Sequence, residues 1–167
     1  PYTGILISDK ENVTLEGNGI VGHFHIGVYI NNSKNVDISK VNFTGNEISI
    51  YSANSSGIII DNNQFYTNIA GIRFYTIADS MISNNAFDSN DISSISLFDS
   101  RDNLIDDNVI SSSLNGIFID TKSTNTSLNS NHFTRSFGVD INIGNGGKFN
   151  DINNSISNNT CAISIPE

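Results

Sequence analysis

The sequence predicts an all-β protein built as a parallel β-helix, a solenoid in which short strands stack coil upon coil. The first observation behind this prediction is composition, because the 167 residues include 27 Ile and 27 Asn but only six Leu and no Trp. Helical proteins draw on Ala, Leu, Glu, Lys and Arg, whereas β-branched and aromatic residues fit a pleated sheet. The second observation is a repeat of 22 or 23 residues along the chain, which is typical of a solenoid.

The repeat centres on an Asn-x-Phe or Asn-x-Ile unit whose last residue we expect to point into the core. These apolar residues are Ile20, Phe43, Phe65, Phe87, Ile110, Phe133 and Ile156. Asn stands two residues before each of them except Phe43, which follows Val41. The corner of a coil needs backbone angles that Asn tolerates well, and stacked Asn amides can hydrogen-bond to one another. The sequence therefore predicts ladders of Asn at the corners of the coils.

Two apolar residues separated by one position follow each of these units. The pairs are Ile5/Ile7, Val28/Ile30, Ile48/Ile50, Ile72/Phe74, Ile95/Leu97, Ile117/Ile119, Val139/Ile141 and Ile163/Ile165. A period of two is typical of a strand with one buried face. A leucine-rich repeat of similar length would need Leu at several fixed positions, and six Leu are too few. We expect a single-stranded solenoid of about seven rungs, which at about 4.8 Å per rung gives a rod about 35 Å long.

The charge of the chain excludes several classes of partner. The formal net charge of −9 arises from 17 acidic and 8 basic residues without a basic cluster. Such a surface repels nucleic acids and anionic membranes, and no apolar run is long enough for membrane insertion. A polyanionic substrate would need a bridging cation, for which Ca²⁺ is the candidate. Residues 1–167 are expected to form one domain of a longer chain, with flanking domains or self-association covering the strand edges at the rod ends.

The motifs NVTLEGNGI, NVDISKVNF, GIIIDNNQF and NLIDDNVI resemble the right-handed parallel β-helix repeats of pectin-lyase-like proteins. They are most similar to the carbohydrate-binding and sugar-hydrolase group, which includes NosD-like periplasmic proteins. The resemblance implies a right-handed solenoid that is extracellular, at the cell surface or periplasmic, with polysaccharide lying along one sheet. Motifs of the related lyases, polygalacturonases and alginate epimerases are missing, so it stays open whether the chain is an enzyme. His23 and His25 suggest copper, but two ligands are too few, and no metal site is predicted.

Five aromatic residues occupy outward-facing positions on the alternating strands: Tyr29, Tyr51, Tyr75, Phe98 and Phe118. Exposed aromatic residues on neighbouring rungs are unusual without a partner. Sugars stack their C–H faces on aromatic rings, and the nearby carboxylate of Asp99 can bond to sugar hydroxyls. The strip predicts a polysaccharide-binding surface. The alternative is that a loop or a second chain covers it.

Three charged residues near this strip are candidates for catalysis. Asp120 and Asp140 fall on adjacent rungs in neighbouring columns, so their Cα atoms are expected about 8 Å apart. Two carboxyl groups about 6.5–9.5 Å apart suit an inverting glycosidase. Arg73 would hold an acidic sugar or stabilise developing negative charge. The alternative is that all three are solubilising charges.

The sequence thus predicts a secreted or cell-surface β-helix that binds polysaccharide along one exposed sheet face. If the chain is an enzyme, we expect a polysaccharide hydrolase or lyase. The competing hypothesis is a non-catalytic structural stalk, an adhesin or a protein-interaction module.

Overall fold

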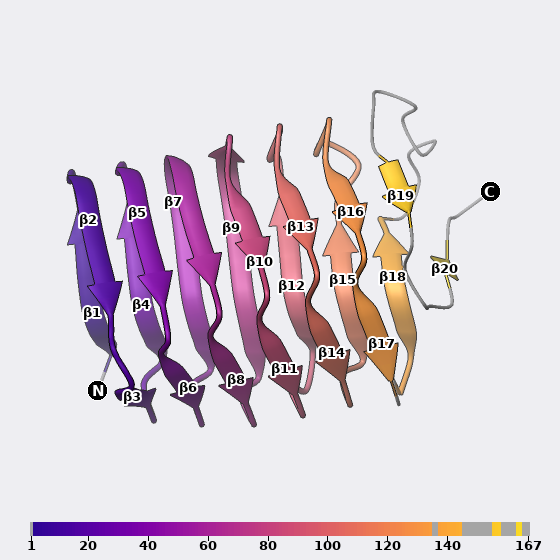
Figure 1. The fold of residues 1–167 in the computed structure, drawn as a ribbon, viewed down its shortest axis with the longest axis horizontal. Helices are drawn as coiled ribbons and strands as arrows, with labels where there is room; N and C mark the ends of the chain where they lie inside the picture. The colour runs from indigo at the N-terminus through magenta and orange to yellow at the C-terminus, as the bar shows by residue number, and fades with distance from the viewer. Residues whose placement is uncertain (1, 135–136, 145–154, 158–162, 165–167) are drawn as a thin grey trace.

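The protein is a rod of stacked coils in which the strands of successive coils lie side by side (Figure 1). The computed structural model describes residues 2–134 and 137–144, and the strand segments 155–157 and 163–164 without their side chains. Strands of successive coils pair in parallel. Within the described ranges there is no helix long and apolar enough to cross a membrane. The all-β parallel solenoid is confirmed.

Each coil contributes strands to three walls. The first wall contains β1 (Thr3–Ser8), β4 (Ile26–Asn31), β7 (Ile48–Asp61), β9 (Ala70–Ala78), β12 (Ser93–Phe98), β15 (Asn115–Ile119), β18 (Val139–Ile143) and β20 (Ile163–Ser164). The second wall contains β2 (Glu11–Glu16), β5 (Lys34–Ser39), the C-terminal half of β7, β10 (Met81–Ser83), β13 (Leu104–Asp106), β16 (Ser127–Asn129) and β19 (Ser155–Ser157). The third wall contains β3 (Ile20–Gly22), β6 (Asn42–Thr44), β8 (Gln64–Tyr66), β11 (Ala86–Asp88), β14 (Val109–Ser111) and β17 (His132–Thr134).

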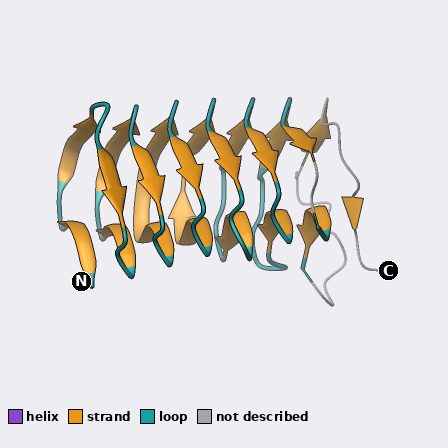
Figure 2. Cartoon of the chain, turned by 90° about the horizontal axis from the view of Figure 1, so that it is seen from below, coloured by secondary structure: helices purple, strands orange, loops and turns teal. Residues whose placement is uncertain are grey.

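The long strand β7 turns a corner without a break and belongs to both the first and the second wall, so these two walls form one 14-stranded sheet. The third wall is a separate six-stranded sheet. Short loops join the walls around each coil (Figure 2). The strands make about six turns of solenoid, close to the seven rungs expected.

The core consists of files of identical or similar side chains that run along the rod. Phe43 stacks on Phe65 with ring centroids 4.9 Å apart, and Phe65 stacks on Phe87 at 4.5 Å. Ile110 and Phe133 continue the same file on the next two coils. Stacking places apolar surface of each coil on apolar surface of the next, which is the main force that holds coils together. The predicted interior file is confirmed from Phe43 to Phe133. The position expected for Ile156 after Phe133 was wrong, because β19 belongs to the second wall and Ile156 pairs there with Leu128.

The predicted Asn ladder also exists, and its hydrogen bonds connect each coil to the next. Nδ2 of Asn63 donates to Oδ1 of Asn85, and Nδ2 of Asn85 donates to Oδ1 of Asn108. The backbone N–H groups of Asn63 and Asn85 donate to the same two oxygens. A second ladder follows the third wall, where Nδ2 of Asn46 donates to Oδ1 of Asn68. Because these amides are buried, their bonds satisfy polar groups that the corners would otherwise leave unpaired.

The first coil differs from the prediction by one residue. Val21, not Ile20, pairs with Phe43, and Ile20 is 72% exposed. The Asn ladder stops at Val41, which has no side-chain amide, so Asn18 has no partner there to hold its register. A shift of one position reverses the face to which every side chain points. The inward position expected for Ile20 was therefore wrong.

Two strands of the first wall are displaced by two positions from the expected columns. In β7 the buried pair is Ile50 and Ser52, and in β18 it is Ile141 and Ile143. A shift of two residues keeps each side chain on its expected face but changes the neighbour on which it stacks. The pair expected at Ile163 and Ile165 extends beyond the described residues.

Candidate functional site

The outer face of the first wall carries a continuous row of five aromatic rings, here called the aromatic ladder. Its members are Tyr29, Tyr51, Tyr75, Phe98 and Phe118. The centroids of consecutive rings are 5.3, 5.4, 4.4 and 5.4 Å apart along the row. All five side chains are half-buried because each ring shields its neighbours. Their expected position on one outer strip is confirmed.

The ladder moves between two columns of the wall because of the register of β7. Tyr51 pairs with Arg73, so Arg73 occupies the place of a ring in the first column. Tyr75 and Phe98 pair in the neighbouring column, two positions further along their strands. Phe118 lies again in the first column. The column expected for Tyr51 was therefore wrong; a constant step of 22 residues from Val28 to Ile50 places Tyr51 beside Tyr29, as observed.

The rings present mainly edges to solvent in the middle of the ladder. The planes of Tyr75 and Phe98 differ by only 10°, so each ring covers one face of the other. The edge of an aromatic ring is positive and attracts oxygen atoms. A sugar lying on this wall would meet ring edges and tyrosine hydroxyls. The expected stacking of sugars on open ring faces is therefore reduced for this pair.

Arg73 lies on β9 and faces outward next to the aromatic ladder. Its neighbours in the same column are Tyr51 on β7 and Ser96 on β12. The side chain is half-buried, and its Nε atom is enclosed without a hydrogen-bond partner. Burial, then the neighbouring Tyr75 and Tyr29, raises the pKa of the Tyr51 hydroxyl, while the charge of Arg73 acts in the opposite direction. Tyr51 is therefore neutral at pH 7, and Arg73 is charged.

The two carboxylates proposed for catalysis do not lie next to each other. Asp140 follows Val139, which pairs with Asn115, and a Cβ added to Gly116 would lie 2.4 Å from the Asp140 carbonyl oxygen. Asp120 is four residues beyond Gly116, which is about 13 Å along the strand. The expected Cα spacing of about 8 Å was therefore wrong, because β18 is displaced by two residues.

Asp120 has a structural role at the corner after β15. One of its carboxylate oxygens accepts hydrogen bonds from the backbone N–H groups of Asp99, Lys122 and Ser123. The Ser123 hydroxyl donates to the same oxygen at 2.7 Å. These bonds cap a turn. Asp99 is exposed at the preceding corner with a left-handed φ of 48°, beside the end of the aromatic ladder.

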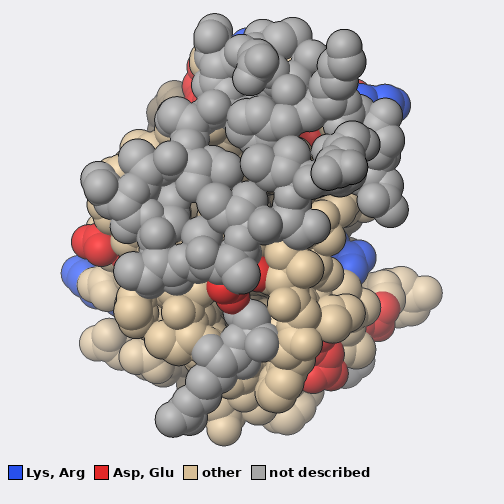
Figure 3. Space-filling model, turned by 90° about the vertical axis from the view of Figure 1, so that its right-hand side faces the viewer, with Lys and Arg blue, Asp and Glu red and all other residues tan. Residues whose placement is uncertain are grey.

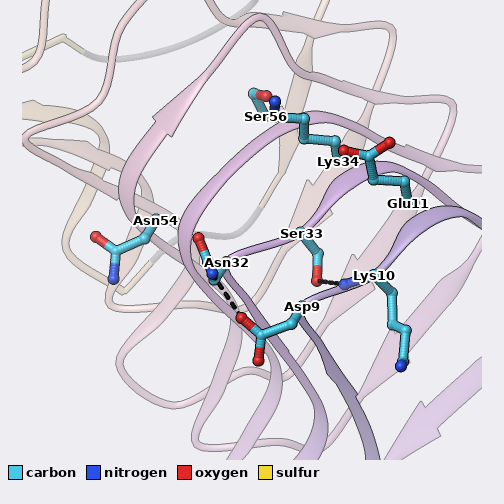
Figure 4. Close-up of a pocket in the computed structure, with 8 residues that line it drawn as sticks. All are labelled: Asp9, Lys10, Glu11, Asn32, Ser33, Lys34, Asn54 and Ser56. Atoms are coloured by element: carbon cyan, nitrogen blue, oxygen red, sulfur yellow. Dashed lines mark hydrogen bonds between the residues drawn. The ribbon is translucent and has the colours of Figure 1, made fainter.

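A shallow polar hollow of about 310 Å³ lies where the first and second walls meet near the N-terminal coils (Figure 4). Its lining residues are Asp9, Lys10, Glu11, Asn32, Ser33, Lys34, Asn54 and Ser56. Nδ2 of Asn32 donates to Asp9, and Oγ of Ser33 accepts from the backbone N–H of Lys10. Charges of both signs line the hollow, and these hydrogen bonds connect corners of adjacent coils. They support the fold and define no chemistry.

Acidic and basic side chains are also interspersed on the end of the rod that Figure 3 faces, where red and blue groups are visible around the rim. Among the described residues, no three His, Cys, Asp or Glu side chains gather in a way that could hold a metal ion. Ca²⁺ bridging of a polyanion therefore stays a prediction from net charge alone.

Comparison with known proteins gives one family and one fold. The family described as "Periplasmic copper-binding protein (NosD)" matches residues 1–166. No curated protein matches the sequence. A double mutant of the periplasmic alginate epimerase AlgG is similar in structure, with 19% sequence identity and a TM-score of 0.55 over 89% of this chain and 40% of that one.

A second AlgG structure has 18% identity and a TM-score of 0.52 over 78% of this chain and 35% of that one. The chain thus spans 40% or less of the length of these epimerases. At this level of identity the likeness shows a shared fold.

The family description names copper, which binds to imidazole, thiolate and thioether ligands. His25 contacts Glu47 through Nδ1, and its ring lies 5.4 Å from that of Tyr2. His23 adopts a left-handed φ of 62° and lies over Gly45 on the next coil. His132 belongs to β17, several coils away, and Cys161 lies outside the described residues. Two imidazoles at one corner do not complete a copper site, so the described donors do not fit this metal.

Proposed function

The chain belongs to the NosD family of periplasmic copper-binding proteins, a family of right-handed β-helices, and we propose that it binds polysaccharide along the outer face of its first wall. A location outside the cytoplasm agrees with the family's periplasmic description. The observation that carries the proposal is the aromatic ladder, which spans five successive coils.

The ladder is suited to a long ligand that runs parallel to the rod. Neighbouring coils are about 4.8 Å apart, so the same kind of contact recurs at each coil. Three tyrosine hydroxyls and the exposed carboxylate of Asp99 offer hydrogen bonds to sugar hydroxyls. The structural neighbours support this class of ligand, because they are alginate epimerases and alginate is a polysaccharide.

Catalysis is no part of this proposal. Asp120 and Asp140 are too far apart for the paired-carboxylate mechanism. Asp120 is also bound into a turn. A hydrolase or lyase activity would need other residues than this pair.

Titration of the protein with oligosaccharides, followed by calorimetry and by NMR signals of Tyr and Phe, tests the proposal. Replacing Phe98 with Ser removes the fourth of the five rings, which contacts both Tyr75 and Phe118, and is expected to weaken binding at least tenfold. The matched control is Tyr66→Ser, because Tyr66 is 55% exposed but lies on the third wall. Equal binding by both variants, or no response of wild-type protein to any oligosaccharide, would contradict the proposal.

A second candidate function is a structural stalk or scaffold, as the sequence also suggested. The observation that favours it is the contact between the rings, since stacked aromatic side chains stabilise neighbouring strands by themselves. In a stalk, Phe98→Ser would lower the free energy of unfolding and no glycan would bind. Denaturation and binding measured on the same variant therefore distinguish the two functions.

A further inference from the structure

We propose that Arg73 is the anchor for an acid group of the ligand, so that the first wall selects acidic polysaccharides over neutral ones. This inference rests on the proposed function and names its substrate class. Its basis is the position of an unpaired guanidinium within the aromatic ladder.

Arg73 differs from Arg101 and Lys40, each of which forms an ion pair with a carboxylate. Arg101 bonds to Asp102 at 2.7 Å, and Lys40 bonds to Glu16 at 2.6 Å. Among the residues that the structure describes, no carboxylate pairs with Arg73, and its enclosed Nε has no hydrogen-bond acceptor. The enclosed Nε is out of reach of a ligand in this conformation, so a bound acid group would contact the outer N–H groups of the half-buried guanidinium.

Among the residues that the structure describes, no carboxylate pairs with Arg73 or occupies a neighbouring position on the adjacent strands. Its neighbours in the column are Tyr51 and Ser96, and the column beside it contains Tyr75 and Phe98. The described side chains that face it are therefore aromatic rings and hydroxyl groups, with no carboxylate among them. Asp99 lies beyond Phe98 at the corner. A carboxylate bound to Arg73 would meet no like charge at contact distance.

The overall charge of −9 opposes an acidic ligand only at long range. Salt screens such repulsion beyond about 8 Å at physiological ionic strength. A direct contact with the half-buried guanidinium is screened much less than charges separated by bulk solvent. The local attraction therefore outweighs the distant repulsion.

The guanidinium group matches the shape of a carboxylate. Its parallel N–H groups donate two hydrogen bonds to the two carboxylate oxygens, and such charge-assisted bonds are about twice as strong as neutral ones. The hydroxyls of Tyr51 and Tyr75 lie on the flanking side chains and are available to neighbouring sugar hydroxyls. A uronic acid unit offers both groups on one ring.

The probes for the test are an alginate hexasaccharide and the same hexasaccharide with its carboxyl groups reduced to primary alcohols. Calorimetry at two salt concentrations measures both with wild-type protein, Arg73→Gln and the control Arg101→Gln. Wild type is expected to bind the acidic form at least tenfold more tightly. Arg73→Gln should lose this preference and its salt dependence while binding the reduced form as wild type does. Arg101→Gln, which removes an exposed cation at another corner, should keep the preference.

Each outcome is informative. If wild type binds both forms equally, or if Arg73→Gln keeps the preference, the inference fails and polysaccharide binding stands. If neither form binds, polysaccharide binding fails and the inference fails with it. Should Arg73→Gln not fold, Arg73→Lys replaces it, because Lys keeps the charge but not the two-pronged geometry, and the preference is then expected to fall without vanishing.

Discussion

Replacing Asn85 with Ala is expected to lower the free energy of unfolding, because it removes hydrogen bonds from the Asn ladder to both adjacent coils. Asn85 is 2% exposed. Its Nδ2 donates to the Ile60 carbonyl at 2.8 Å, and its Oδ1 accepts from the Asn63 backbone N–H at 2.9 Å. Asn85→Ala deprives these two buried backbone groups of the side-chain bonds.

The expected loss follows from the cost of unsatisfied buried groups, which is about 1–3 kcal/mol each. Two such groups give a loss of about 4 kcal/mol in the free energy of unfolding. A domain of this kind has about 5–15 kcal/mol in total, so Asn85→Ala should leave a marginal protein. Asn85→Asp should be no better, because a carboxylate accepts hydrogen bonds but cannot donate to Ile60 or to Asn108.

Urea denaturation followed by circular dichroism and by tyrosine fluorescence measures this loss, since the chain has five Tyr and no Trp. The control is Asn42→Ala, because Asn42 lies at an outward position of β6 and its side chain makes no hydrogen bond to the described residues. It should change the free energy by no more than about 0.5 kcal/mol. Equal losses in the two variants, at similar slopes against urea, would refute the role assigned to the ladder.

Three further predictions concern the core, a close approach of two coils and the aromatic ladder. Phe87→Ala should cost about 3–5 kcal/mol in urea denaturation, because it opens a cavity in the phenylalanine file. Gly71→Ala should lower the denaturation midpoint, since the added Cβ would lie 2.4 Å from a backbone oxygen of the next coil, whereas Gly19→Ala, whose Cβ meets nothing within 4 Å, should not. The pKa of Tyr51 is raised in the folded state, so folding favours the neutral hydroxyl. This contribution to the free energy of unfolding is complete below pH 10 and disappears as the pH rises through the raised pKa. Tyr51→Phe should therefore begin to unfold at a higher alkaline pH than wild type.

The three-coil neighbourhood of Arg73 illustrates how far a repeat can be interpreted from its sequence. Period two correctly identified the outward face for Tyr51, Arg73 and Tyr75. The column expected for Tyr51 was wrong by two positions. A strand displaced by two residues keeps each side chain on the same face, so a period of two does not reveal the displacement. The pairing of Arg73 with Tyr51 on one side and Ser96 on the other was therefore not predicted.

The catalytic hypothesis shows the same limit. Asp120 and Asp140 were assigned to neighbouring columns from strand spacing alone. From Ile117 to Ile141 the coil is 24 residues long instead of 22 or 23. The two additional positions displace Asp140 toward the start of the strand, while Asp120 accepts bonds from the corner that follows.

By itself, the sequence determined the class of fold, the interior file and the Asn ladders, because these depend on side chains that recur at one period and pair with copies of themselves. Only the tertiary structure decided which side chains lie next to each other on the outer surface. Inside the rod, Phe65 and Asn85 have one place each that satisfies packing and hydrogen bonding. On the outside, the side chains are partly solvated, so several registers have similar free energies for them. The stacking of whole coils therefore determines which residues lie next to Arg73.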